Sequence, residues 1–162
     1  MKRILVVGCP GGGKSTFAKK LHQRTNLPLY HLDLIWHKAD KTTITREEFD
    51  QRLQGILQTD AWIIDGNYSR TLEMRLQQCD KVFLLDFPTE VCLQGARSRV
   101  GRPHNDLPFV EETFDPEFEQ WIRDFSAKEL PKVYALLETY SQVSTTIFKS
   151  REELNRFLEN EL

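Results

Sequence analysis

The chain has 162 residues, 40% hydrophobic and 28% charged, which predicts a single globular domain over residues 1–162. Its 22 basic residues nearly balance 24 acidic ones, and a net charge of −2 disfavours a broad surface for duplex nucleic acid. Its longest apolar runs are far shorter than the roughly 20 residues of a membrane span. With no signal-peptide pattern either, we expect a cytoplasmic protein without a membrane partner.

Short apolar runs and helical-period patterns alternate along the chain. Runs of four or five apolar residues are typical of buried strands, whereas apolar residues three and four apart are typical of helices packed on a sheet. Strands are predicted at 2–7, 29–32, 62–65, 82–85 and 143–148, and helices at 14–25, 45–57, 69–78, 88–100, 116–125, 133–140 and 150–158. Residues 34–43 fit neither pattern, and we expect them to be irregular.

Most of the predicted strands are joined by connections too long for hairpins. This alternation favours a parallel sheet with helices on both faces, so we predict an α/β, three-layer, doubly wound domain with about five strands. Ligands of such folds collect at the carboxyl ends of the strands. Gly8, Asp33, Asp65 and Asp86 each follow or close a predicted strand and should therefore lie along one edge.

A glycine-rich motif lies between the first strand and the first helix. It matches the phosphate-loop pattern GxxxxGK[ST] with Gly8, Cys9, Pro10, Gly11, Gly12, Gly13, Lys14 and Ser15. Glycines let backbone amides converge on a phosphate, the helix N-terminus adds positive potential, and the lysine reaches the outer phosphates. The motif predicts an ATP-binding site. Thr16 follows, either as a further phosphate ligand or as a helix cap.

Magnesium is expected beside the phosphates. The Ser15 hydroxyl is one candidate ligand, and Asp65, at the end of a neighbouring strand, is the favoured acidic one. Asp86 competes for that role, but Phe87 and Pro88 follow it at an expected helix start, so we interpret it as mainly a helix cap.

Two residues after the second strand are candidates for the acceptor site. The Asp33 carboxylate either accepts a proton from an acceptor hydroxyl or simply caps a turn. Trp36 either stacks on an aromatic ligand or packs as part of the core or a lid.

A polar stretch after the predicted helix 88–100 is the expected mobile segment, a lid-like loop around residues 99–113. Arg97, Arg99 and Arg102 lie in or beside it, where a closing lid would bring guanidinium groups onto the transferred phosphoryl group. The alternative is a solvated helix end, where arginines are favoured electrostatically. Arg70 either binds an anionic group of the acceptor or lies at the surface, and no histidine is assigned a role.

With these residues in place, the chain resembles the adenylate-kinase-like group of small phosphate-loop kinases. More narrowly, it resembles the bacterial topology modulation proteins, through Gly8–Ser15, His31–Asp33, Trp62–Tyr68, Leu84–Pro88, Arg102–Asp106 and Phe118–Phe125. The resemblance implies a P-loop NTPase fold like that of adenylate and shikimate kinases. It also implies ATP and Mg²⁺ as cofactors, an arginine-bearing lid after the fourth strand, and an acceptor site between the second and third strands.

The chain departs from the nucleoside monophosphate kinases at the acceptor motif. Those enzymes carry Asp-Gly-Phe-Pro-Arg, whereas this chain has Asp65-Gly66-Asn67-Tyr68-Ser69, with an arginine one place later. The acceptor class therefore stays open between a monophosphate and an uncharged molecule held by Asn67, Tyr68 and Asp33.

The leading hypothesis is an ATP- and magnesium-dependent phosphotransferase acting on a nucleoside, a nucleotide or another hydroxyl-bearing metabolite. Lys14, Arg97 and Arg102 would neutralise the transferred charge and Asp33 would position the acceptor. The alternative is a nucleotide-binding regulator that affects DNA topology without kinase activity, although the charge balance disfavours direct binding to nucleic acid. Sequence does not define the oligomeric state.

Overall fold

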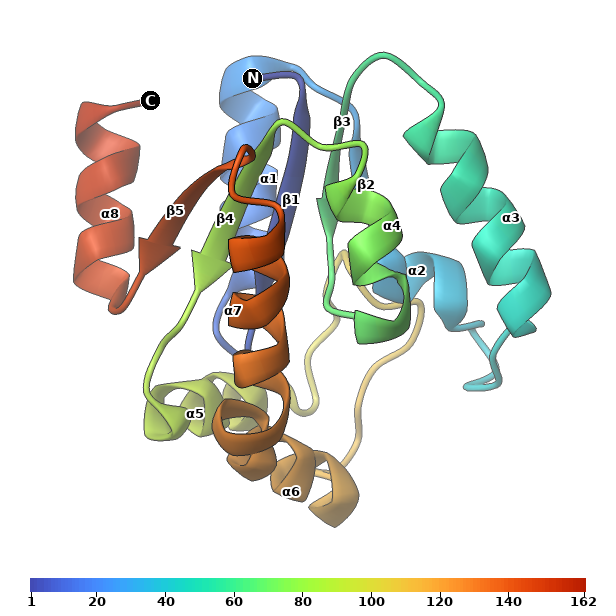
Figure 1. The fold of residues 1–162 in the computed structure, drawn as a ribbon. Coiled ribbons are helices and arrows are strands. Elements are labelled where there is room, and N and C mark those ends of the chain that lie inside the picture. The colour runs from blue at the N-terminus through green and yellow to red at the C-terminus, as the bar shows by residue number, and fades with distance from the viewer.

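A five-stranded sheet runs through the centre of the computed structural model, which describes residues 1–162 (Figure 1). Every pair of neighbouring strands is parallel, in the order β2-β3-β1-β4-β5. The strands are β1 (Arg3–Gly8), β2 (Leu29–His31), β3 (Trp62–Asp65), β4 (Lys81–Leu85) and β5 (Ser144–Phe148). The predicted five-stranded parallel sheet is confirmed.

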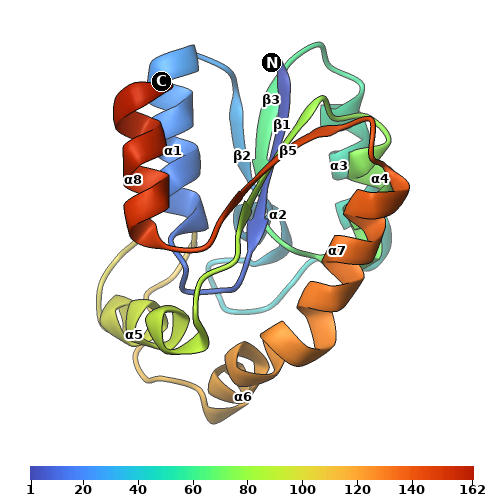
Figure 2. The same cartoon turned by 60° about the vertical axis from the view of Figure 1, so that its left-hand side comes forward.

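Helices cover both faces of this sheet, as the alternating pattern predicted. They are α1 (Lys14–Thr25), α2 (Leu32–Trp36), α3 (Arg46–Leu57), η1 (Ser69–Thr71), α4 (Leu72–Leu76), α5 (Thr89–Arg99), α6 (Pro116–Asp124), η2 (Phe125–Glu129), α7 (Leu130–Thr139) and α8 (Arg151–Asn160). In Figure 2, α1 and α8 lie on one face of the sheet, and α3, α4 and α7 lie on the other. None of these helices is long and apolar enough to cross a membrane.

Alternation along the central strands supplies both cores. In β1, Ile4 and Val6 belong to the core shared with α1, α5 and α8, whereas Leu5 and Val7 belong to the core shared with α3, α4 and α7. All four side chains are buried, because a central parallel strand is covered on both sides. This double burial explains why β1 reads as an uninterrupted apolar run.

Helix starts agree with the capping signals in the sequence. Thr45 and Ser150 accept hydrogen bonds from the backbone amides three residues later, and Asp115 caps α6 with proline at the first helical position. Asp86 does not act as expected: the N-cap of α5 is Pro88, with no side-chain hydrogen bond. Asp86 instead accepts hydrogen bonds from Lys149 and Tyr134, each at 2.6 Å.

Two local predictions were wrong. Residues 34–43 are not wholly irregular, because α2 begins at Leu32, whose side chain is fully buried against the sheet. Likewise, the predicted helix 69–78 is split into η1 and α4. A π-helical segment, η2, joins α6 to α7, and Figure 2 shows the resulting bend below the sheet.

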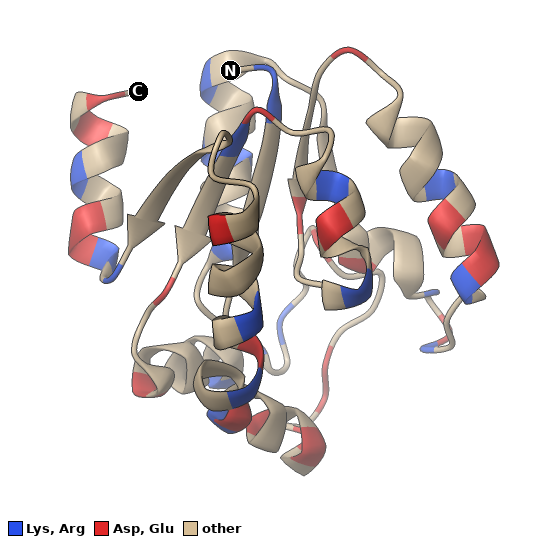
Figure 3. Cartoon of the chain, in the orientation of Figure 1, with Lys and Arg blue, Asp and Glu red and all other residues tan.

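The carboxyl ends of the strands all open toward α5, α6 and the loop of residues 100–115, which contains no helix or strand (Figure 1). In the same orientation, Figure 3 shows basic and acidic residues interspersed over the helices rather than separated. Because the strands end here, a site at this edge is bounded by helix ends and loops (Figure 1).

The three cysteines are free thiols.

Candidate active site

The phosphate loop connects β1 to α1 at the edge where the strands end. Gly11 and Gly13 adopt φ angles of 82° and 96°, a left-handed conformation that favours glycine. Gly12 donates its amide to Cys9 O at 3.1 Å, but the amides of Gly11 and of residues 13–16 make no hydrogen bond within the chain. Five backbone donors are therefore free at a helix N-terminus, which suits a polyphosphate.

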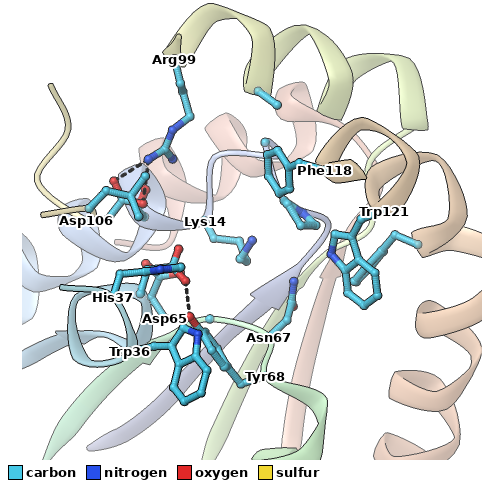
Figure 4. A pocket seen from close by; sticks show the side chains of 18 of the residues that line it. Lys14, Trp36, His37, Asp65, Asn67, Tyr68, Arg99, Asp106, Phe118 and Trp121 are labelled. Carbon is cyan, nitrogen blue, oxygen red and sulfur yellow. Dashed lines mark hydrogen bonds and ion pairs between the residues drawn. The ribbon is translucent and has the colours of Figure 1, made fainter. Parts of the chain in front are cut away.

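The two polar side chains of this motif face a cavity of about 860 Å³ (Figure 4). Lys14 extends into its centre, where its only hydrogen bond goes to Cys9 O at 3.3 Å. Ser15 also lines the cavity, whereas Thr16 is exposed and does not. Thr16 is not a helix cap either, since Gly13 occupies that position.

Besides Lys14 and the N-terminus of α1, an arginine of α8 brings positive charge to the phosphate loop. Arg151 begins α8, and its guanidinium nitrogens lie 3.4 Å from where Cβ atoms on Gly13 and Gly95 would be. The same guanidinium lies over the ring of Phe87, 5.8 Å from its centroid. Arg151 can therefore add to the potential that attracts a triphosphate, a role that sequence reasoning did not assign.

The loop after β3 is tied directly to the start of the phosphate loop. The Asn67 amide donates to Gly8 O at 2.5 Å, and its oxygen accepts from the Gly8 amide at 3.0 Å. Asn67 therefore holds the end of β1, and because its side chain also lines the cavity and keeps one N–H unpaired, its contact with the acceptor stays a prediction. No spacing rule relates residues 59 apart, so sequence alone could not find this pair.

A fully buried arginine holds the same loop in place. Arg75, on α4, donates to the carbonyl oxygens of Gly66 at 3.0 Å, Asn67, and Tyr68 at 3.2 Å, and to the Thr71 hydroxyl at 3.3 Å. Burial lowers the pKa of Arg75 to about 10, which still leaves it charged near neutral pH. No role was assigned to Arg75 from the sequence.

Tyr68 connects the loop after β3 to the carboxylate of Asp33, the candidate residue for the acceptor site. Its hydroxyl donates to Asp33 Oδ1 at 2.6 Å, and the dashed line above Tyr68 in Figure 4 marks this bond. Burial raises the pKa of the Asp33 carboxyl above its usual value, and the hydrogen bond from Tyr68 opposes part of that rise. Asp33 lies in α2 rather than at a strand end, yet it does line the cavity.

The candidate metal ligand Asp65 has a histidine partner. Nδ1 of His31 donates to Asp65 Oδ2 at 2.6 Å, although no histidine was expected to have a role. Burial lowers the pKa of His31, but the hydrogen bond and charge of Asp65 outweigh it, and the net shift is upward. Asp65 Oδ1 has no hydrogen-bond partner, so one carboxylate oxygen remains available. His, Cys, Asp and Glu side chains nowhere form a cluster of three suited to a metal.

The arginines of the expected lid occupy different surroundings. Arg97 pairs with Glu119 at 2.9 Å and lies over Phe114, while Arg102 is exposed and makes no ion pair. Neither lines the cavity. Arg99 does, and it pairs with Asp106 at 2.8 Å (Figure 4).

Aromatic side chains form much of the remaining wall. Trp36 packs edge-on against Phe49 and Tyr68, with ring centroids 5.7 and 6.4 Å apart. Helical spacing along residues 118–125 predicts that Trp121 packs in the core, and this prediction is wrong: Trp121 is 42% exposed and faces the cavity, whereas its neighbour Ile122 is buried. Helical spacing marked one apolar face but did not reveal that a cavity lies beside it.

Comparison with known proteins adds the fold relationship. No family model matches the chain. An adenylate kinase from Clavibacter michiganensis subsp. michiganensis is 33% identical over 88 residues, and one from Thermotoga neapolitana is 26% identical over 88. Each match spans 53% of this chain but only 42% and 39% of the relative, so less than half of each curated protein is represented.

Solved structures match along nearly the whole chain. Shikimate kinase from Bacteroides thetaiotaomicron superposes with a TM-score of 0.62 at 18% identity, covering 99% of this chain and 96% of its own. Shikimate kinase from Acinetobacter baumannii, solved with shikimate, gives 0.59 at 20% identity over 98% and 92%. The chain therefore has the α/β P-loop NTPase fold that these shikimate kinases have.

Proposed function

We propose that this protein is an ATP- and magnesium-dependent phosphotransferase whose acceptor is a small hydroxyl-bearing molecule. The observation that carries the proposal is the meeting, in one cavity, of Lys14 and the free amides of the phosphate loop with the Asp33 carboxylate. The first group neutralises a triphosphate and the second accepts a hydroxyl proton. The similarity to adenylate and shikimate kinases supports the same reaction class.

The phosphate-loop residues that would hold the nucleotide are Gly8, Pro10, Gly11, Gly12, Gly13, Lys14 and Ser15, and Thr16 would contribute its free backbone amide rather than its side chain. Magnesium prefers oxygen ligands and keeps several waters, which fits the Ser15 hydroxyl together with the one available oxygen of Asp65. When bound, magnesium would neutralise charge between the outer phosphates. His31 would fix the orientation of the Asp65 carboxylate.

Residues 99–113 are proposed as the lid. Arg97 and Arg102 are its candidates for stabilising the transferred phosphoryl group, and closure would have to bring them to the cavity. Arg99 already faces it, so single alanine variants of the three arginines would identify which one contributes to kcat. The narrower relationship to the topology modulation proteins and a cytoplasmic location belong to the same proposal.

The test is ADP release from magnesium-ATP against a panel of nucleosides, nucleotides and hydroxy acids, with calorimetry of ATP binding in parallel. We expect acceptor-stimulated turnover in the wild type. Lys14→Ala and Asp33→Asn separate the two halves of the site: the first should lose ATP-dependent turnover, and the second should keep ATP affinity while losing transfer. A folded protein that binds no ATP, or binds it and transfers phosphate to no acceptor, would contradict the proposal.

A further inference from the structure

The acceptor end of the cavity is unusually aromatic, and this permits a further inference that rests on the proposed function. Two walls of the cavity carry rings: one belongs to α2, α3 and the loop after β3, and the other to α6 and η2. The rings are those of Trp36, Phe49 and Tyr68 on the first wall and Phe118, Trp121 and Phe125 on the second. Figure 4 shows Phe118 and Trp121 across the cavity from Trp36 and Tyr68.

Trp121 is the most exposed of these six aromatic side chains. It contacts Phe125 at a centroid distance of 6.4 Å, but 42% of its surface stays exposed on the cavity wall. A large aromatic side chain facing a concave apolar wall is typical of a site that takes a flat ring. Tyr68 lies on the opposite wall with its hydroxyl already bonded to Asp33, so its ring is held in a fixed orientation.

The charges at this end do not suit a phosphorylated acceptor. Arg70 is bound by both oxygens of Asp50, at 2.8 and 3.0 Å, and Arg99 is bound by Asp106. A phosphate is typically held by several charge-assisted hydrogen bonds, often from a guanidinium fork. Two exposed cations of the cavity lining have no ion pair: Arg46, at the start of α3, and Lys41, whose Nζ lies over the ring of Phe109 at 5.9 Å from its centroid. Neither forms part of a cluster of donors.

We infer that the acceptor is an uncharged molecule with a planar aromatic ring and a free hydroxyl group, the chemistry of a nucleoside. Its ring lies between Tyr68 and Trp121, and its hydroxyl is placed on Asp33. The hydroxyl oxygen attacks the γ-phosphorus of ATP, the new O–P bond forms, and the bond to the β–γ bridging oxygen breaks. ADP leaves with that electron pair, and the hydroxyl proton passes to the Asp33 carboxylate.

The test compares nucleosides, their 5′-monophosphates and shikimate as acceptors in the ADP-release assay, with wild-type protein and two variants of Trp121. We expect turnover with at least one nucleoside. Trp121→Leu should raise the KM for that nucleoside about tenfold, the usual worth of stacking one base on an aromatic side chain. Trp121→Tyr, which keeps an aromatic ring, should restore most of it, and the KM for ATP should not change in either variant.

Arg46→Ala is the matched control, because an uncharged acceptor does not need this guanidinium and its KM should stay within about twofold of wild type. Turnover confined to monophosphates or to shikimate would overturn the inference while leaving the proposed function intact. So would an Arg46→Ala variant whose acceptor KM rises tenfold, or a Trp121→Leu variant with an unchanged one. No turnover with any acceptor would instead overturn the proposed function.

Discussion

Gly95 lies inside α5, outside the phosphate-loop motif, yet the structure places it against that loop. A Cβ added to Gly95 would fall 1.9 Å from Gly11 O and 3.0 Å from its carbonyl carbon. Real Cβ atoms essentially never come within 3.0 Å of another heavy atom, and the neighbour here is backbone that cannot rotate away. Gly95→Ala must therefore shift α5 or the phosphate loop by about 1 Å.

We expect Gly95→Ala to destabilise the protein, although helix propensity alone would predict that it stabilises it. Alanine normally stabilises a helix interior by about 1 kcal/mol over glycine, but overpacking a close contact costs about 1–3 kcal/mol. We therefore expect Gly95→Ala to lower the free energy of unfolding by up to about 2 kcal/mol. Gly55→Ala is the matched control, since Gly55 also lies in a helix, α3, and a Cβ there would meet nothing within 4 Å. It should stabilise the protein by about 0.5 kcal/mol.

Urea unfolding followed by circular dichroism measures both variants, and calorimetry measures their affinity for magnesium-ATP. In a thermal melt of a chain of this length, a change of 1 kcal/mol in the free energy of unfolding shifts Tm by about 2–4 °C, so the two variants should be clearly distinguished. Gly95→Ala should also weaken ATP binding, because the displaced Gly11 belongs to the phosphate loop. If Gly95→Ala were as stable as Gly55→Ala and bound ATP as tightly as wild type, the close approach of α5 to the loop would be refuted.

Three further predictions concern the site. Lys14→Ala should lower kcat by about 10²-fold, because the transferred phosphoryl group loses the positive charge of the lysine beside it. Thermal melts should show a nearly unchanged Tm, since Lys14 makes only one weak hydrogen bond. Arg75→Met should lower the free energy of unfolding by about 3 kcal/mol in urea titrations, because three carbonyl oxygens lose their donor, and Arg75→Lys should recover part of it. Asp33 acts as a base only when ionised, so kcat/KM should fall as pH drops through its raised pKa; Tyr68→Phe removes the hydrogen bond that lowers that pKa and should move this acid limb to higher pH.

Each of these has a result that would contradict it. A Lys14→Ala protein with wild-type turnover would remove the lysine from the phosphate site. An Arg75→Met protein as stable as wild type would show that the loop after β3 holds its shape without the guanidinium. An acid limb that stays in place or moves to lower pH in Tyr68→Phe would separate Asp33 from the observed titration.

The sequence supported reliable predictions wherever a pattern is local. The order of strands and helices follows from apolar periodicity, the starts of α3 and α8 from Thr45 and Ser150, and the phosphate loop from contiguous residues. The α2 helix was missed because its five residues are too few to show a period, and it depends on tertiary packing such as the burial of Leu32 against the sheet. The exposed position of Trp121 was missed because periodicity does not distinguish a core from a cavity wall.

The sequence by itself therefore determined the class of fold and the place of the phosphate-loop motif, because both depend on neighbours within one strand, turn or helix. Only the tertiary structure decided how the two halves of the site are joined. It paired Asn67 with Gly8, Tyr68 with Asp33 and His31 with Asp65, across 34 to 59 positions of sequence. These contacts arise when parallel strands bring their carboxyl ends to one edge, and no spacing along the chain encodes which side chains then meet.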